Sequence, residues 1–142
     1  MSRTAFYQLY FHLVSSTKGH IPLIKETLLE YTAHVVTEDA KKRGAVVIAC
    51  AAMPDHLHLL VSLPPTIAVS TFIGQVKGAT AHEINSTVGE KMIIWQEGYG
   101  ALTLRASDLE KVARYVNNQP RIHASRLKNS VLEVTTSPIH GA

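Results

Sequence analysis

Short apolar runs alternate along the chain with longer runs of helical spacing, and together they predict a mixed α and β domain. Five short runs rich in aliphatic, β-branched and aromatic residues predict strands: 6–14, 45–52, 56–63, 92–95 and 101–104. Two longer runs repeat apolar residues on one helix face: 25–43 and 67–85. This order predicts an α+β fold in which helices cover one face of an antiparallel, ferredoxin-like (split βαβ) sheet.

Local signals predict where the helices begin and end. Basic residues at 41–43 followed by Gly44 predict the end of the first helix. Residues 107–110 (Ser-Asp-Leu-Glu) have the pattern of a capping box and predict the start of a C-terminal helix. Gly74 and Gly78 weaken the second helix by roughly 1 kcal/mol each relative to alanine, and they leave room for a close approach.

Two histidines two residues apart stand out in the predicted strand at 56–63. Because side chains alternate in a strand, His56 and His58 share one face while Leu57 and Leu59 take the other. The leucine face should enter the core, which leaves the histidines side by side on the opposite surface. Such a pair can hold one divalent cation when a third ligand comes from elsewhere, and the alternative is a pair of half-exposed sheet histidines.

The predicted C-terminal helix carries a second pair of polar side chains. Tyr115 and Gln119 are four residues apart and therefore lie on one flank of the apolar stripe formed by Leu109, Val112 and Val116. A phenol and a carboxamide thus point the same way. Taken without the histidines, they are better explained as a tyrosine that closes the edge of the core and a solvated surface amide.

Composition sets the class of the protein. A chain of 142 residues with 46% hydrophobic residues is expected to form one domain, 1–142, with a core of its own. The single cysteine, Cys50, excludes a disulfide framework and cysteine-rich zinc sites, and its apolar neighbours predict an inert buried thiol. Neither a signal peptide nor a membrane span is evident, so we expect a soluble, cytoplasmic protein.

Charge is concentrated near the C-terminal helix, although the net charge of +3 is modest. The stretch 105–128 contains six basic and two acidic residues: Arg105, Lys111, Arg114, Arg121, Arg126 and Lys128 against Asp108 and Glu110. Such an excess is typical of a surface that binds a phosphate backbone, and an ordinary solvated helix face is the alternative. Lys18 and His20, in a polar loop at 15–20, are further candidates for phosphate contacts.

Three motifs together resemble the single-tyrosine HUH transposases, which move very small insertion sequences as single-stranded DNA. The motifs are MPDHLHLLV at 53–61, WQEGYG at 95–100 and YVNNQ at 115–119. Their order and spacing agree with the family from the first strand to about His123. The tail from about residue 124 carries no motif that matches.

The resemblance implies a metal-dependent transposase that cleaves and rejoins DNA at hairpin-marked ends. It implies His56, His58 and Gln119 as ligands of a divalent cation, magnesium or manganese, and Tyr115 as the nucleophile that forms a 5′-phosphotyrosine. Family members are homodimers that build each active site from the histidine pair of one subunit and the tyrosine helix of the other. Residues expected to bind DNA are Lys18, Arg105, Lys111, Arg114 and Arg121. Pro120 disfavours helical geometry at the preceding Gln119.

Other functions fit the sequence less well. The ligand types alone leave zinc open beside manganese and magnesium, because imidazole suits zinc. A histidine-triad hydrolase needs a third alternating histidine where Leu60 stands, and a two-histidine phosphoesterase needs a second motif for which 123–125 is the nearest match. The main alternative is a noncatalytic single-stranded nucleic-acid-binding module, which would stack bases on Phe6, Tyr10 or Phe11 and need no metal.

Overall fold

Strands and helices alternate along residues 5–119, the part of the chain that the computed structural model describes. In chain order they are β1 (Tyr10–Ser16), α1 (Leu29–Lys42), β2 (Val46–Met53), β3 (His56–Ser62), α2 (Val69–Val88), β4 (Gly100–Leu104) and α3 (Leu109–Asn117). Three short 3-10 turns connect them: η1 (Lys18–His20), η2 (Glu26–Leu28) and η3 (Ala106–Asp108). No helix within residues 5–119 combines the length and apolarity that a membrane span needs.

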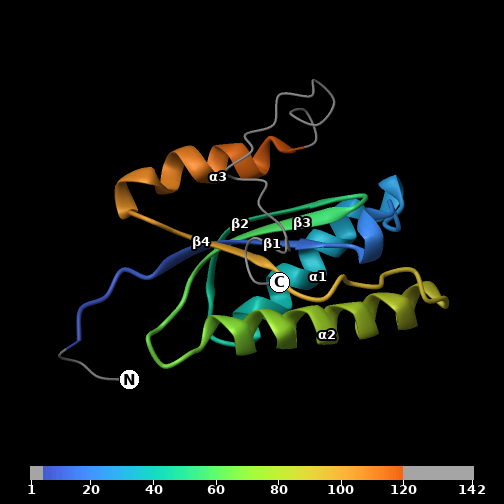
Figure 1. Cartoon of the computed structure of the whole chain (residues 1–142), viewed down its shortest axis with the longest axis horizontal. Helices are drawn as coiled ribbons and strands as arrows, with labels where there is room; N and C mark the ends of the chain where they lie inside the picture. The colour runs from blue at the N-terminus through green and yellow to red at the C-terminus, as the bar shows by residue number, and fades with distance from the viewer. Residues whose placement is uncertain (1–4, 120–142) are drawn as a thin grey trace.

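The four strands form one antiparallel sheet in the order β2-β3-β1-β4. With the chain order β1, α1, β2, β3, α2, β4, this strand order is the split βαβ arrangement, so the predicted α+β, ferredoxin-like fold is confirmed. Figure 1 shows three layers, with α1 and α2 on one side of the sheet and α3 on the other.

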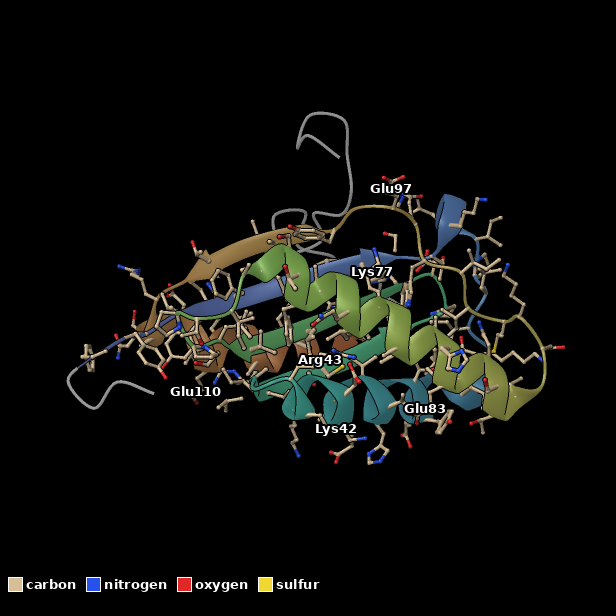
Figure 2. All side chains as sticks on the ribbon, turned by 90° about the horizontal axis from the view of Figure 1, so that it is seen from below. Lys42, Arg43, Lys77, Glu83, Glu97 and Glu110 are labelled. Atoms are coloured by element: carbon tan, nitrogen blue, oxygen red, sulfur yellow. The ribbon has the colours of Figure 1, made fainter. Side chains whose placement is uncertain are left out.

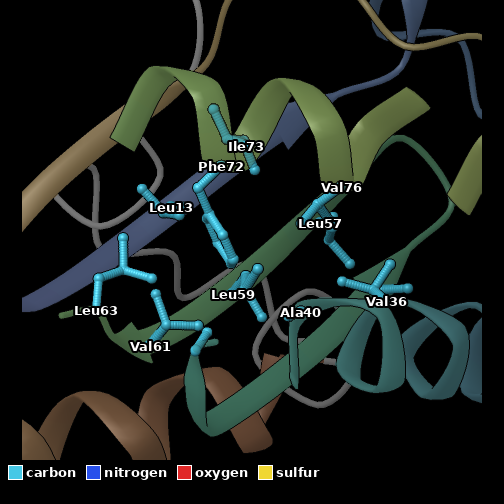
Figure 3. Packing of buried hydrophobic residues seen from close by; sticks show 12 residues of the cluster. Leu13, Val36, Ala40, Leu57, Leu59, Val61, Leu63, Phe72, Ile73 and Val76 are labelled. Atoms are coloured by element: carbon cyan, nitrogen blue, oxygen red, sulfur yellow. The ribbon is translucent and has the colours of Figure 1, made fainter. Parts of the chain in front are cut away.

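The face under α1 and α2 contains the main hydrophobic core (Figure 3). Leu57 and Leu59 of β3 and Leu13 of β1 meet Phe72 and Val76 of α2, and each of these side chains is at most 1% exposed. The alternation predicted for β3 is therefore confirmed. This aliphatic layer fixes the pairing register of β1 and β3, because a slip of one residue would exchange the two faces.

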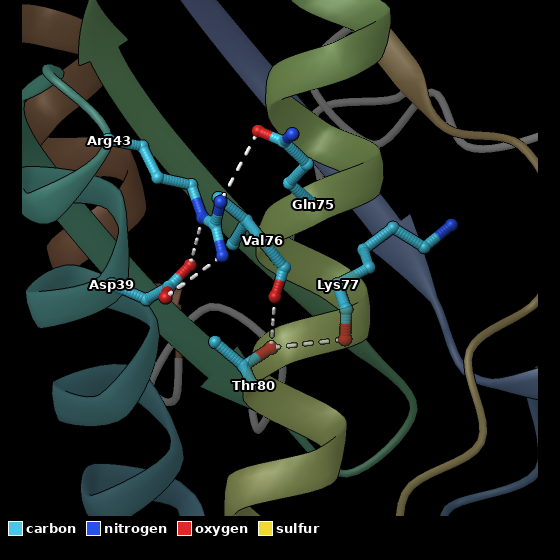
Figure 4. A network of polar contacts seen from close by, with 6 residues as sticks. All are labelled: Asp39, Arg43, Gln75, Val76, Lys77 and Thr80. Carbon is cyan, nitrogen blue, oxygen red and sulfur yellow. Dashed lines mark hydrogen bonds and ion pairs between the residues drawn. The ribbon is translucent and has the colours of Figure 1, made fainter.

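Polar contacts join the two helices of this layer at one end (Figure 4). Arg43, the C-cap of α1, donates from Nε to Asp39 Oδ2 at 2.8 Å and from Nη1 to Gln75 Oε1 of α2 at 3.3 Å. In α2, the Thr80 hydroxyl donates to the Val76 carbonyl at 2.6 Å, so this buried polar group is satisfied within its own helix.

Two predicted strands differ from the observed ones. The first begins at Tyr10 and not at residue 6, because its partner β3 ends at Ser62, which pairs with Tyr10. The segment 92–95 is not a strand and makes only an isolated bridge between Trp95 and Thr17. The reason lies in Asn85 of α2, whose side chain donates to the Ile93 carbonyl at 3.0 Å and accepts from the Ile93 amide at 2.8 Å. These bonds satisfy backbone groups that a strand would have paired.

The sequence signals predicted the positions of the helix ends correctly, but they were partly wrong about the contacts that form those ends. Helix α1 ends at Lys42, close to the predicted end, and Gly44 has a positive φ of 97°, which glycine adopts readily. Helix α3 starts through the turn η3, its N-cap is Asp108, and no side chain of the cap residue bonds to the helix, so the predicted capping box is wrong. No atom of residues 5–119 lies within 4 Å of a Cβ built on Gly74 or Gly78, so no close approach uses them there.

Candidate active site

His56 and His58 lie on the sheet face turned towards α3. As predicted, they share this face, but both are buried, with only 6% and 0% of their surface exposed. The prediction of an exposed pair is wrong because α3 covers this side of the sheet. Leu60 of β3 packs there against Val112 and Val116 of α3 and holds the helix over the histidines.

A carboxylate in the β2–β3 turn holds His56. Asp55 Oδ1 lies 2.7 Å from His56 Nδ1. The turn is anchored in its own right, since the Thr17 amide and hydroxyl both donate to the Asp55 carbonyl, at 3.0 and 3.1 Å. When Nδ1–H donates to a carboxylate, the lone pair of the imidazole resides on Nε2, which is the arrangement found at metal-binding histidines.

His58 is held by a third histidine. His12 Nε2 of β1 lies 2.8 Å from His58 Nδ1, and the two rings stack with centroids 5.0 Å apart at 22°. The His56 and His58 rings meet edge to face at 4.9 Å. Sequence reasoning missed His12. The signal was its position in the alternation of β1, but its relation to His58 depends on a strand register that the sequence pattern does not specify.

Tyr115 of α3 lies beside the histidine pair. Its ring centroid is 6.0 Å from that of His58, at an interplanar angle of 84°. The helix therefore docks on the histidine face within a single chain, whereas the resemblance implies that the tyrosine helix of one subunit serves the histidine pair of the other. Helix α3 ends at Asn117, Asn118 forms a turn, and Gln119 has helical geometry again, so the non-helical geometry expected from Pro120 is not found at Gln119.

Two buried polar groups, one on β1 and one just after α3, have no hydrogen-bond partner among residues 5–119. The first is the side-chain amide of Gln119, whose oxygen and nitrogen both lack a partner there, and the second is the hydroxyl of Ser16. Each of the two residues is 0% exposed. Ser16 is directly opposite His56 in the β1–β3 register, so their side chains leave the sheet on the same face. Buried groups of this kind are rare in folded proteins and commonly mark a place for an ion, a water or a ligand.

The donors on this face fit a divalent cation. Two imidazoles whose Nδ1 atoms are engaged leave Nε2 to bind, and a buried amide oxygen is a suitable further ligand for magnesium or manganese. Within residues 5–119, no three His, Cys, Asp or Glu side chains are placed to share an ion. A third ligand from residues 5–119 would therefore be of another type, and the amide of Gln119 is of that type.

The WQEGYG segment at 95–100 is fixed next to this face by a lysine that sequence reasoning missed. Lys77 of α2 donates from Nζ to the carbonyls of Gln96 at 2.8 Å and Gly98 at 2.6 Å (Figure 2). The Gln96 side chain in turn accepts from the Gly19 amide at 3.1 Å. Burial lowers the pKa of Lys77, and the carboxylate of Glu97 opposes this shift. The lysine thus joins α2 to the segment before β4, and Gln96 joins that segment to the loop that follows β1.

The predicted DNA-binding residues that the structure describes are all exposed. Arg105 pairs with Asp108 at 3.3 Å and Arg114 pairs with Glu110 at 2.8 Å, whereas Arg121 lies outside the described residues. Surface pairs of this kind contribute about 0–1 kcal/mol, so they do not prevent an arginine from turning to a phosphate.

Cys50 takes no part in this chemistry. Burial raises the pKa of its thiol to about 12, and a hydrogen bond with Thr37 only partly offsets this shift. The raised pKa favours a neutral thiol at physiological pH, in line with an unreactive cysteine, but the side chain is only half-buried and not buried as predicted.

A tyrosine beside a buried histidine pair on a ferredoxin-like sheet defines a class of DNA-processing protein. The chain belongs to the IS200-like transposase family, whose model (Transposase IS200 like) matches residues 5–119. This confirms the family expected from the three sequence motifs. The chain is similar to the ISDra2 transposase TnpA of Deinococcus radiodurans, with 28% identity over 119 residues that cover 80% of this chain and 85% of the relative.

Two solved structures share the fold. A crystal structure described as a transposase from Deinococcus radiodurans has a TM-score of 0.67 and 24% identity, and the match covers 84% of this chain and 96% of that one. The structure of a REP-associated tyrosine transposase bound to a REP hairpin has a TM-score of 0.59 and 21% identity, over 87% of this chain and 74% of that one.

Proposed function

We propose that this transposase cleaves and rejoins single-stranded DNA at hairpin-marked element ends through a 5′-phosphotyrosine intermediate. The observation that carries the proposal is the position of Tyr115, 6.0 Å from His58 between ring centroids, in a fold shared with a transposase bound to a DNA hairpin. Membership of the IS200-like family and the likeness to the ISDra2 transposase support the same reaction class.

In this mechanism the Tyr115 hydroxyl attacks the scissile phosphorus. The phenolic oxygen forms a P–O bond, the bond to the 3′-oxygen breaks, and a proton passes overall from the phenol to the departing 3′-hydroxyl. The product conserves the phosphodiester energy, so another 3′-hydroxyl can reverse the step and join new ends. A phenol has an ordinary pKa of about 10, so attack at neutral pH needs help at the phosphate.

That help comes from a divalent cation, magnesium or manganese, which when bound offsets the charge of the phosphate oxygens. The residues that would hold it are His56 and His58 through Nε2 and Gln119 through its amide oxygen. The chain's own part is to keep these atoms in place. Asp55 and His12 occupy the Nδ1 atoms, and α3 excludes water from the histidine face.

We also propose that the protein acts as a homodimer, so that two active sites can exchange two DNA ends. The single chain already brings Tyr115 to His58, so sharing of sites between subunits is not needed to assemble the pair. Mixing a His56→Ala variant with a Tyr115→Phe variant distinguishes the two arrangements. Shared sites predict that the mixture regains cleavage through one complete composite site, whereas sites built within one chain predict no recovery.

The central test is formation of a covalent adduct. The protein is incubated with manganese and single-stranded oligonucleotides that carry candidate hairpin ends, and the products are separated under denaturing conditions. We expect an adduct with the wild type and none with His56→Ala or His58→Ala, although both should still bind the hairpin. The matched control is His34→Ala, an exposed histidine on α1.

Two outcomes would contradict the proposal in different ways. Cleavage by His56→Ala at the wild-type rate in the presence of EDTA would exclude the metal. Tight hairpin binding without any adduct, from every candidate end tested, would favour the noncatalytic binding module, for which the 86% exposed Phe6 offers a stacking surface.

A further inference from the structure

His12 is the one member of the histidine cluster on 5–119 that the proposed mechanism does not use as a ligand. It is 1% exposed, and it leaves β1 on the same sheet face as His58. Burial of an imidazole this far from water is costly unless its nitrogens are engaged. The energetic reason to keep a histidine here must therefore come from what it bonds.

The geometry separates two possible roles for His12. A third metal ligand would have to aim a ring nitrogen at the same point as His56 and His58, and no such three-residue group exists among residues 5–119. Instead, His12 Nε2 lies 2.8 Å from His58 Nδ1, and the two rings stack at 22°. His12 therefore acts on His58 and not on an ion.

We propose that His12 is a positioning residue that selects the metal-binding tautomer of His58. His58 donates its Nδ1–H to His12 Nε2, which keeps the proton off Nε2 and leaves that lone pair for a divalent cation. His12 carries its own proton on Nδ1. Because the two ring planes lie within 22° of each other, the hydrogen bond also fixes the plane of the His58 ring.

The two ligand histidines are then supported by different devices. His56 relies on the carboxylate of Asp55, a turn residue whose side chain is 39% exposed. His58 relies instead on a neutral imidazole in the sheet interior. A second carboxylate at the position of His12 would add a buried negative charge, which an imidazole acceptor avoids. The inference rests on the proposed cation site, and its test distinguishes failure of the inference from failure of the cation site.

The first measurement needs no variant. In the metal-free wild type, long-range ¹H–¹⁵N spectra of the histidine rings report which nitrogen of His58 is protonated. We expect the Nδ1–H tautomer for His58. The Nε2–H tautomer for His58 in the wild type overturns the inference.

The second measurement is the affinity for Mn²⁺ in the absence of DNA. The concentration of the free ion is monitored by electron paramagnetic resonance. His12→Leu removes the acceptor and should weaken Mn²⁺ binding roughly 10- to 100-fold, the usual effect of losing such a partner. His12→Gln keeps a polar atom near the position of Nε2 and should recover part of the loss. His34→Leu, on the exposed side of α1, should bind like the wild type.

The outcomes below distinguish a positioning role of His12 from a purely structural one. If His12→Leu folds and binds Mn²⁺ like the wild type, while His56→Ala does not, the inference fails and the proposed function stands. If both variants bind like the wild type, the proposed cation site fails as well. If His12→Leu does not fold, the wild-type tautomer and the affinity of His12→Gln decide the matter.

Discussion

The two faces of the sheet are built on opposite principles. The face under α1 and α2 has a core cluster of twelve buried apolar residues, and the buried polar side chains on this side include the hydroxyls of Ser15, Thr32 and Thr80. The apolar cluster under α3 has only four buried members, and beside it lie the buried polar side chains His12, His56, His58, Ser16 and Gln119. The first face supplies the cohesion of the fold. The second gives up part of that cohesion to bury the polar groups of the proposed cation site.

This difference places the proposed nucleophile on the less firmly held layer. Helix α3 is nine residues long and is held mainly through Val112 and Val116 against Leu60 and Ala49. Isolated helices this short are not stable in water, so the position of Tyr115 depends on that small cluster. Perturbing the two faces in matched ways should therefore separate stability from chemistry.

The largest expected effect is the loss of chemistry with little loss of structure. Tyr115→Phe removes one oxygen and should abolish the covalent adduct, while it lowers the free energy of unfolding by no more than about 1.5 kcal/mol, the usual worth of one hydrogen bond. Denaturing gels report the adduct and urea titration reports stability. Tyr99→Phe, in the loop before β4, is the control and should still form an adduct. Peptide mapping of the adduct to any tyrosine except Tyr115 would refute the assignment.

The next effect compares two neighbouring leucines on opposite faces of β3. Leu59 and Leu60 are both 0% exposed, and replacing either by alanine should cost roughly 2–5 kcal/mol. Leu59→Ala should lower global stability and leave the activity of the folded fraction intact. Leu60→Ala should in addition loosen α3, speed amide hydrogen exchange in 109–117 and slow adduct formation per folded molecule. Equal slowing in both variants would show that the two faces are not separable.

A smaller effect of opposite sign is expected at Gln119. An amide buried without a partner costs about 1–3 kcal/mol, so Gln119→Met, similar in length and apolar, should stabilise the metal-free protein by about 1 kcal/mol. The same change should weaken Mn²⁺ binding. Thermal unfolding with and without Mn²⁺ measures both, and Asn118→Met, at an exposed neighbour, is the control. A destabilised variant with unchanged Mn²⁺ affinity would make Gln119 a purely structural residue.

Sequence periodicity predicted the fold and the shared sheet face of His56 and His58, and the reasons are local. The alternation of His56 and His58 with the leucines depends only on the period of a strand, and it holds. The burial of the histidines depends on where α3 docks, which no local pattern encodes. His12 was missed for a related reason, since strand pairing joins residues 46 positions apart.

The failed strand at 92–95 shows how a side chain can override backbone propensity. The apolar run suggests a strand. However, the side-chain amide of Asn85 hydrogen-bonds to both the carbonyl and the N–H of Ile93, so these groups do not pair with a neighbouring strand. Met92 and Ile93 still enter a core, beside Ile84. The pattern predicted burial correctly and secondary structure wrongly, because apolar residues are needed in both cases.

The smallest expected effect tests which face of the sheet contacts DNA. Lys111 is exposed on α3, and Lys42 is exposed on α1 at the other side of the sheet (Figure 2). Replacing either lysine by glutamine removes one positive charge, so the long-range field changes equally. Only a lysine that contacts a phosphate should lower the slope of log affinity against log salt concentration, by about 0.7 for a single strand. We therefore expect Lys111→Gln to reduce the slope in fluorescence anisotropy titrations with hairpin DNA, and Lys42→Gln to leave it unchanged. An equal reduction by both would place DNA on both faces and would end the division between a structural and a chemical side of the sheet.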